Sequence, residues 1–292
     1  MVDSMLAPQT PANSTMDWWR HAVIYQIYPR SFADGNGDGI GDLRGIISRL
    51  PAIADLGVDA LWLSPFYTSP QKDGGYDVAN YCDVDPVFGS LSDAQELFDT
   101  AHQLGLRIIV DVVPNHSSDQ HEWFQHALAS PAGSPERARY MFREGHGADH
   151  EFPPNNWESV FGGSAWTRVT EADGSRGQWY LHLFDESQPD FNWDNLQVWE
   201  LFRGVLRFWL DRGVDGFRVD VAHGLVKESG LPDKKPVPNP PLGDDGPFWA
   251  PKRGGGESPR HAMTYLPQIP LRPGQGPKLS SEQASTHCSW LG

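Results

Sequence analysis

The spacing of apolar residues predicts strands that alternate with helices along the first four-fifths of the chain. Short runs rich in β-branched and aromatic residues predict strands, whereas apolar positions three and four residues apart predict amphipathic helices. The expected strands are residues 22–32, 60–66, 107–116 and 216–222, and the expected helices are residues 42–57, 90–105 and 195–213. Strands separated by helices are typical of a parallel sheet. This order fits either a doubly wound sheet or a (β/α)8 barrel.

Local signals refine the helix boundaries. Pro51 inside the first helix predicts a kink or a division into two shorter helices. Ser90 or Ser92 is the expected N-cap of the second helix. In the segment QPDFNWDN, Asn192 or Asp194 is the expected N-cap of the third helix.

Two stretches break this pattern. Residues 117–194 are rich in Gly, Pro, His, Asn and Trp, and they predict a mostly irregular subdomain inserted after the third strand. Residues 231–292 are rich in Pro and Gly and contain no useful apolar period, which predicts a disordered tail foreign to the fold. The expected organisation is therefore a disordered start, residues 1–16, and a barrel domain made of residues 17–116 and 195–230 around the insert.

Composition excludes several classes of partner. The net charge of −15 argues against nucleic acids and anionic membrane surfaces, which attract basic proteins. No run approaches the ~20 apolar residues of a membrane helix, and the first sixteen residues lack the features of a signal peptide. Two cysteines are too few for a disulfide framework. We therefore expect a soluble cytoplasmic protein with neither nucleic acid nor membrane as partner.

The loop DGNGDGIGD, residues 34–42, predicts a cation site. Its glycines allow tight folding, and its alternate positions carry the oxygen atoms that Ca²⁺ or Mg²⁺ prefers. Those oxygens belong to Asp34, Asn36, Asp38 and Asp42. An EF-hand is excluded because the twelfth position is Gly45 rather than glutamate and a strand precedes the loop. A plain glycine-rich turn is the alternative.

The segment GFRVDVAH in the fourth strand contains the strongest candidate for chemistry. Arg218 and Asp220 are two residues apart, so their side chains point to the same face of a strand. A cation beside a buried carboxylate keeps that carboxylate ionised and fixed in place. This arrangement suits a nucleophile.

Polar residues also follow the second and third strands. DVVPNH ends with His116, which can donate to a substrate hydroxyl or serve only its own loop. DGGYDV offers the aromatic face of Tyr76 and the carboxylate of Asp73, although it also reads as a simple turn. Gln188 could reach a ligand from the insert. Since barrel enzymes build their sites at the carboxyl ends of strands, these positions favour the barrel over the doubly wound sheet.

Taken together, these motifs resemble the α-amylase superfamily, glycoside hydrolase family 13, and in particular its α-glucosidase and oligo-1,6-glucosidase branch. The resemblance rests on WWRHAVIYQIYPRSFADGNGDGIGDL, LWLSPFYTSPQKDGGYDV, DVVPNH, FGGSAW, QPDFNW and GFRVDVAH, which occur in this order between residue 17 and about residue 231. It implies a (β/α)8 barrel with a subdomain after the third strand. It also implies a retaining, exo-acting α-glucosidase that acts on oligosaccharides or small α-glucosides.

The resemblance further implies a role for each candidate residue. Asp220 would be the nucleophile, and Arg218 would hold it charged. His116 would donate to the sugar, Tyr76 would stack beneath it, and Asp73 would bind the terminal glucose hydroxyls. The pocket lining contributed by the insert would be Phe161, Phe184 and Gln188. The ligands of the structural Ca²⁺ or Mg²⁺ would be Asp34, Asn36, Asp38, Asp42 and the Ile40 carbonyl.

The chain departs from the family pattern after the fourth strand. The family's acid/base glutamate ends the fifth strand, and a His-Asp pair follows the seventh, but neither motif follows Asp220 here. The later glutamates are Glu228, Glu257 and Glu282, and no apolar strand precedes any of them. The likeness is expected to stop between Asp233 and Trp249. An altered reading frame or a truncated gene product would explain the change.

Two hypotheses follow from this departure. Retention requires two carboxyl groups about 5–5.5 Å apart, so a chain without the acid is expected to be inactive, with a loss of about 10²–10⁴ in rate. Four strands cannot close a barrel, so exposed edges predict poor solubility, a molten state or self-association. The alternatives are a non-catalytic interaction module, as in the transporter heavy chains of this superfamily, a trehalose-forming or glucosyl-transferring relative, or a simple cation-binding protein.

Overall fold

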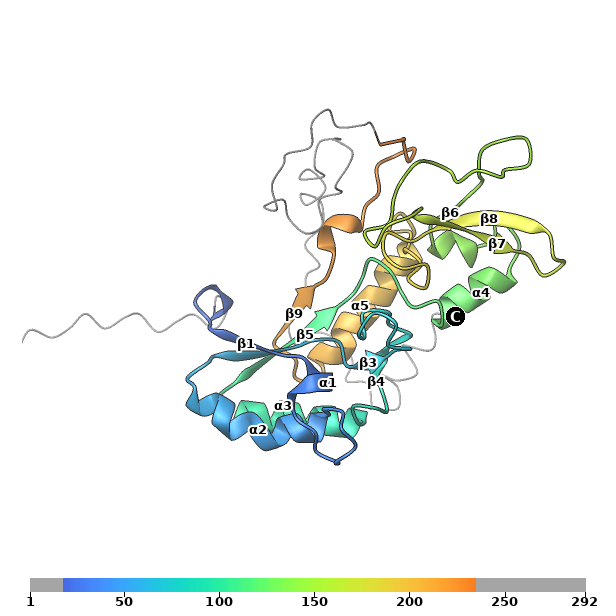
Figure 1. Ribbon diagram of the computed structural model, residues 1–292. Helices are drawn as coiled ribbons and strands as arrows, with labels where there is room; N and C mark the ends of the chain where they lie inside the picture. Colours follow the sequence, from blue (N-terminus) through green and yellow to red (C-terminus); the bar gives the residue numbers. More distant parts are fainter. Residues whose placement is uncertain (1–17, 235–292) are drawn as a thin grey trace, which may run out of the picture.

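The computed structural model describes residues 18–234, and a parallel sheet of four strands lies at its centre (Figure 1). The strands are β1 (Ile24–Ile27), β2 (Ala60–Leu63), β5 (Arg107–Val112) and β9 (Gly216–Val219), in the spatial order β1-β2-β5-β9. Every neighbouring pair is parallel. The carboxyl ends of all four strands therefore meet at one edge, as the alternation of strands and helices predicts.

Three amphipathic helices connect these strands. They are α2 (Leu43–Asp55), α3 (Leu91–Gln103) and α5 (Leu196–Leu210). Their apolar stripes share one hydrophobic core with the sheet, and α2 lies against α3 (Figure 1). Helix α2 continues through Pro51, so the prediction of two shorter helices is wrong. The buried residues on both sides of Pro51, such as Ile46 and Ile53, hold the two halves against the same core.

A capping box begins helix α3. The Ser90 hydroxyl accepts a hydrogen bond from the Asp93 N–H, and the Asp93 carboxylate accepts one from the Ser90 N–H at 2.9 Å. Ser92 lies inside the helix, which decides between the two expected caps in favour of Ser90.

Helix α5 begins one residue later than the sequence predicted. Its N-cap is Asn195, whose side chain accepts from the Gln197 N–H at 2.9 Å, so the prediction of Asn192 or Asp194 is wrong. The Asn192 side chain instead donates to the Ala138 carbonyl at 2.9 Å, a contact that only the tertiary structure creates.

The insert at 117–194 has a small regular centre. It contains helix α4 (Glu122–Ala129) and an antiparallel sheet in the order β6-β8-β7. The bounds of these strands are β6 (Phe142–Arg143), β7 (Trp166–Thr170) and β8 (Arg176–Leu181). Most of residues 117–194 lie outside these elements, so the insert is mostly irregular, as predicted. The sequence of these strands shows no clear alternation of apolar and polar residues, because β6 is very short and the pairing of β7 with β8 shifts register.

Shorter elements complete the connections. Strands β3 (Tyr67–Thr68) and β4 (Asn80–Val84) pair antiparallel and flank the loop that contains the DGGYDV motif. The remaining elements are α1 (Pro29–Phe32) and the 3-10 helices η1 (Trp18–Arg20), η2 (Arg137–Arg139) and η3 (Ala222–Gly224). Within residues 18–234, no helix is long and apolar enough to cross a membrane.

Strands β1 and β9 form the two edges of the sheet in the described part of the chain. Apolar side chains are exposed on both, with Ile24 44% and Val219 46% accessible. These four strands form an open sheet rather than a closed barrel. The expected disorder of residues 1–16 lies outside the described residues, as does nearly all of the tail.

Candidate active site

A single guanidinium contacts two carboxylates at the carboxyl end of the sheet. Arg218 in β9 lies beside Asp111 in β5, and its Nη1 is 2.8 Å from Oδ1 of Asp111. The same Nη1 lies 2.6 Å from Oδ1 of Asp220, which follows the last residue of β9. A cation placed between two carboxylates offsets their mutual repulsion and favours their ionised forms. The predicted proximity of Arg218 and Asp220 is therefore present.

Asp111 organises the floor of this site. Its side chain is fully buried, and its Oδ2 accepts from Trp62 Nε1 at 3.0 Å and from the Tyr76 hydroxyl at 3.2 Å. Burial raises the pKa of Asp111, and the hydrogen bond and charge of Arg218 oppose that shift. Sequence reasoning omitted Asp111 from the site. The signal was a lone carboxylate inside the otherwise apolar strand RIIVDV, because a buried charge requires a partner.

The aromatic rings of Trp62 and Tyr76 lie against the Arg218 guanidinium. Its central carbon is 5.2 Å from the Trp62 ring centroid and 5.9 Å from that of Tyr76. Cation–π contacts of this kind restrict the guanidinium in addition to its ion pairs. Burial, followed by the charge of Asp111, raises the pKa of Tyr76, so its hydroxyl is a proton donor at neutral pH.

A second chain of contacts joins three predicted residues. The Gln188 amide nitrogen donates to Asp73 Oδ2 at 2.8 Å and lies 3.2 Å from His116 Nε2. Burial raises the pKa of Asp73, while the hydrogen bond from Gln188 lowers it. Burial lowers the pKa of His116, which is only 1% exposed, so its ring is neutral at neutral pH. The negative charge of Asp220 acts on both Asp73 and His116, which places the two chains of contacts in one site.

Two phenylalanine rings continue this row of contacts beyond His116. The Phe184 ring centroid is 5.2 Å from that of His116, and the Phe161 centroid is 5.8 Å from that of Phe184. Phe161 is 57% exposed, so it lies on the outer side of the row. The structure thus brings all the predicted substrate-binding side chains into one continuous region.

The family described as "Alpha amylase, catalytic domain" matches residues 26–253. The chain belongs to the alpha-amylase family. This confirms the resemblance that the sequence motifs indicated. The last matched residue, Arg253, lies slightly beyond the interval in which the likeness was expected to stop.

Several curated relatives are named as glucosidases. A probable alpha-glucosidase of Rhizobium meliloti (strain 1021) is 54% identical over 217 residues, which are 74% of this chain and 38% of the relative. An oligo-1,6-glucosidase of Parageobacillus thermoglucosidasius is 48% identical over 75% of this chain and 38% of its own length. The chain therefore spans less than two-fifths of the length of these relatives.

Solved structures agree with this placement. The alpha-glucosyl transfer enzyme XgtA superposes with a TM-score of 0.72 at 47% identity, covering 79% of this chain and 41% of that protein. Trehalulose synthase MutB from Pseudomonas mesoacidophila MX-45 has a TM-score of 0.71 at 44% identity, covering 78% of this chain and 39% of its own. The fold of the described residues is thus that of alpha-amylase family enzymes over the shared part.

The residue after Asp220 has an unusual backbone. Val221 has φ 47° and ψ 35°, in the left-handed region that β-branched residues rarely adopt. Its carbonyl accepts a hydrogen bond from the Gly224 N–H at 2.8 Å, which closes the tight turn. Conformational strain of this kind is concentrated at functional sites, where surrounding contacts over-determine the backbone.

The DGNGDGIGD loop of this alpha-amylase family chain folds onto its own backbone. The Asp34 carboxylate accepts from the Gly37 and Gly39 N–H groups at 2.6 and 2.7 Å, and Asp42 Oδ1 accepts from the Gly45 N–H as the N-cap of α2. These hydrogen bonds lower the pKa of Asp34. Among residues 18–234, no three Asp, Glu, His or Cys side chains are grouped so that they could hold a metal ion. The carboxylates as arranged do not form a coordination sphere, so the cation site stays a prediction.

Glu228 lies on the exposed chain after η3, and Glu257 and Glu282 lie outside the described residues. The negative charge of Asp220 acts on both Asp73 and Asp111.

Proposed function

We propose that this chain carries the nucleophilic, glucose-binding part of a retaining α-glucosidase site. Asp220 attacks the anomeric carbon, and Arg218 keeps the attacking carboxylate ionised and oriented. The observation that carries the proposal is the 2.6 Å contact between these side chains, at the strand ends where barrel enzymes build their sites. The shared contact of Arg218 with buried Asp111 limits where the guanidinium can lie.

The second chain of contacts supplies the proposed sugar-binding groups. Asp73 accepts from terminal glucose hydroxyls, and His116 donates to a hydroxyl in the cleavage subsite. Tyr76 presents the ring on which the sugar stacks. On the insert, Gln188 orients Asp73, while Phe161 and Phe184 form the outer wall. The support is geometric, because Gln188 touches both Asp73 and His116.

The proposed substrates are malto- or isomalto-oligosaccharides and small α-glucosides. Relatives named alpha-glucosidase and oligo-1,6-glucosidase favour hydrolysis, whereas the alpha-glucosyl transfer enzyme and trehalulose synthase favour glucosyl transfer as the alternative. Both outcomes share the first step, in which Asp220 forms an ester with the anomeric carbon and the leaving group departs with the bonding electron pair.

The proposal separates the first step from protonation of the leaving group. The leaving group of a natural glycoside is an alkoxide, which requires a proton donor, and that donor contributes about 10²–10⁴ in rate. Fluoride leaves without one. A nucleophile that lacks its acid partner should therefore react with an activated glucosyl fluoride while cleaving maltose and isomaltose very slowly.

The test is covalent trapping with 5-fluoro-α-D-glucosyl fluoride, followed by peptide mass spectrometry. The expected result is one fluoroglucosyl adduct on the peptide that contains Asp220, and no adduct in Asp220→Asn. Asp83→Asn, at a partly exposed position in β4, serves as the matched control and should react as the parent does. Reaction at another carboxylate, or no reaction in a folded chain, would overturn the proposed nucleophile.

We further propose that Ca²⁺ or Mg²⁺ binds residues 34–42. The ligands would be side-chain oxygens of Asp34, Asn36, Asp38 and Asp42 together with the Ile40 carbonyl. Support comes from their alternation with glycine and from oxygen-rich chemistry suited to a hard cation. The side chains of Asp34 and Asp42 would have to exchange backbone N–H partners for the ion.

A further inference from the structure

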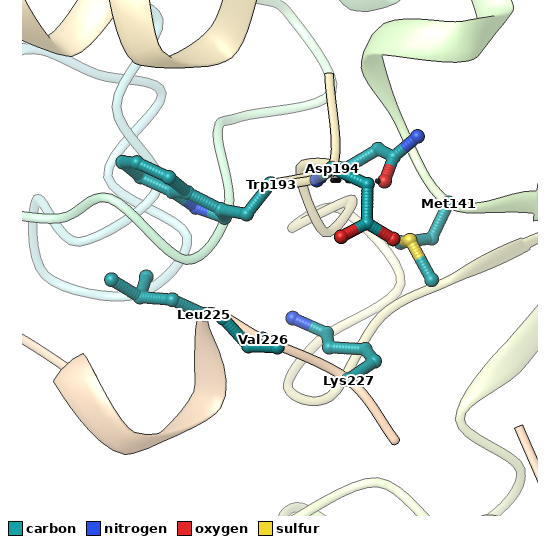
Figure 2. Close-up of a pocket in the computed structure, with 7 residues that line it drawn as sticks. Met141, Trp193, Asp194, Leu225, Val226 and Lys227 are labelled. Atoms are coloured by element: carbon teal, nitrogen blue, oxygen red, sulfur yellow. Dashed lines mark hydrogen bonds between the residues drawn. The ribbon is translucent and has the colours of Figure 1, made fainter. Parts of the chain in front are cut away.

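A buried lysine lies behind the proposed sugar-binding site. The Nζ of Lys227, whose side chain is 5% exposed, is 2.6 Å from Oδ2 of the fully buried Asp190. It also donates to Oδ1 of Asn115 at 2.9 Å and to the Gly224 carbonyl at 2.5 Å. Figure 2 shows the Lys227 side chain beside Val226, across the pocket from Trp193 and Asp194. The ammonium group is therefore enclosed by three separate parts of the chain.

This ion pair determines the orientation of the Asn115 side chain. Lys227 can only donate, so the oxygen of the Asn115 amide must face it. Asp190 can only accept, and the Asn115 nitrogen donates to its Oδ2 at 3.0 Å. Rotating the amide by 180° would place its oxygen against the carboxylate and its N–H groups against the ammonium. Both neighbours thus enforce the same orientation.

The oriented amide presents its second N–H to His116. Asn115 Nδ2 lies 3.2 Å from His116 Nδ1, which must then be the accepting ring nitrogen. A neutral imidazole has one accepting and one protonated nitrogen, so the proton resides on Nε2.

A contact with Gln188 favours the opposite tautomer of His116. The Gln188 amide nitrogen lies 3.2 Å from His116 Nε2, and its oxygen is occupied by the Asp185 N–H at 3.1 Å. Gln188 therefore favours an accepting Nε2, which is the opposite tautomer. One neutral ring cannot accept from both amides. The orientation of the Asn115 amide, which Lys227 and Asp190 fix, therefore decides between the two tautomers.

We propose that the buried Lys227–Asp190 ion pair fixes the Asn115 amide and thereby holds His116 in the Nε2–H tautomer. Nε2 is the nitrogen beside the Gln188 amide, which itself donates to Asp73, so this tautomer provides the proton for a sugar hydroxyl. That last step rests on the proposed function, whereas the tautomer itself does not. Lys227 is a positioning residue that acts through Asn115 and His116.

The test measures the His116 tautomer by two-bond ¹H–¹⁵N correlation in chain labelled with ¹⁵N-histidine. His116→Gln identifies its signals, and magic-angle spinning gives the same measurement if the chain self-associates. The parent chain should show a protonated Nε2 and an unprotonated Nδ1. Lys227→Arg should retain that pattern, because it keeps the cation.

Two variants should reverse the pattern. In the double variant Lys227→Met with Asp190→Asn, both locks are removed without leaving an unpaired buried charge, and Gln188 should draw His116 to the Nδ1–H tautomer. Asn115→Asp places an oxygen beside Nδ1 and should give the same reversal. The matched control removes the ion pair between Lys72 and Asp119 with Lys72→Met and Asp119→Asn. It should leave the His116 tautomer unchanged.

His121 provides an internal indicator of folding. Its ring contacts those of Tyr81, Trp123 and Phe191, so its ring-proton signals are displaced from random-coil positions only in a folded chain. An Nδ1–H parent, or folded variants that keep Nε2–H, would overturn the proposal. If sugar trapping failed while the tautomer behaved as expected, the proposed function alone would be refuted.

Discussion

Arg218 and Asp220 lie 2.6 Å apart although the strand ends between them, at Val219. The contact survives the end of β9 because the Asp220 N–H still donates to the Val112 carbonyl of β5 at 2.9 Å, which keeps Asp220 in line with the strand. Removing the cation should therefore impair the nucleophile more than it changes the backbone around it.

Arg218→Met should slow trapping by the fluoride reagent by roughly ten- to hundred-fold, because it removes a charge-assisted contact from the attacking carboxylate. The measurement is the rate of adduct formation under single-turnover conditions. Arg203→Met provides the matched control, because Arg203 is exposed and, within residues 18–234, pairs with Glu200 one helical turn away. Equal rates for Arg218→Met and the parent would refute the proposed role of Arg218.

His121 should make the stability of the chain depend on pH. Burial, followed by the positive charge of Arg139, lowers its pKa to about 4 from 6.5. Between these values the unfolded chain binds the proton and the folded chain does not, so the free energy of unfolding falls as the pH falls from 6.5 toward 4. The loss should be about 3 kcal/mol across this window.

The variant His121→Asn should reduce this dependence by the contribution of His121 while keeping an N-cap for α4. Urea denaturation at several pH values gives the difference between variant and parent. His126→Asn, on the exposed side of the same helix, is the control and should follow the parent. A parent whose stability is flat over this window would contradict the prediction.

The capping box of α3 allows two neighbouring serines to be compared. Ser90→Ala should lower the free energy of unfolding by about 1 kcal/mol, because it removes the acceptor for the Asp93 N–H. Ser92→Ala, at an exposed position within the same helix, should change it by less than about 0.5 kcal/mol. Chemical denaturation of both variants measures the difference, and equal losses would argue against Ser90 as the cap.

The exposed edges of the sheet should cause self-association. Ile24→Lys combined with Val219→Lys places a charge on each edge strand and should increase the fraction of monomer. Sedimentation velocity over a range of concentrations gives that fraction. Leu196→Lys, at the exposed start of α5, is a control that removes an apolar side chain away from the edges. A parent chain that remains monomeric at high concentration would show that the edges do not drive association.

Calorimetric titration with Ca²⁺ and with Mg²⁺ tests the loop at residues 34–42. Asp38→Asn should weaken binding by roughly ten-fold or more, since affinity for hard cations depends on the number of charged ligands. Asp55→Asn, at the end of α2, is the control and should bind as the parent does. Absence of heat from the parent with either ion would favour the plain glycine-rich turn.

The sequence by itself determined the alternation of strands and helices, the family, and the closeness of Arg218 to Asp220. These depend on spacing along one segment, where the strand period or the helix period fixes which side chains share a face. The motif residues Asp73, His116 and Gln188 were likewise identifiable from the family pattern. Their mutual contacts were not, because Gln188 is 115 residues from Asp73 along the chain.

Only the tertiary structure decided the remaining features. The strands of the insert form because β8 pairs with β6 on one side and β7 on the other, and Asn195 caps α5 while the Asn192 side chain contacts Ala138. Asp111 and Lys227 belong to the site because distant segments bring a cation to one and a carboxylate to the other. A buried charge is stable only beside its partner, and which residue becomes that partner depends on how the chain folds rather than on the local sequence.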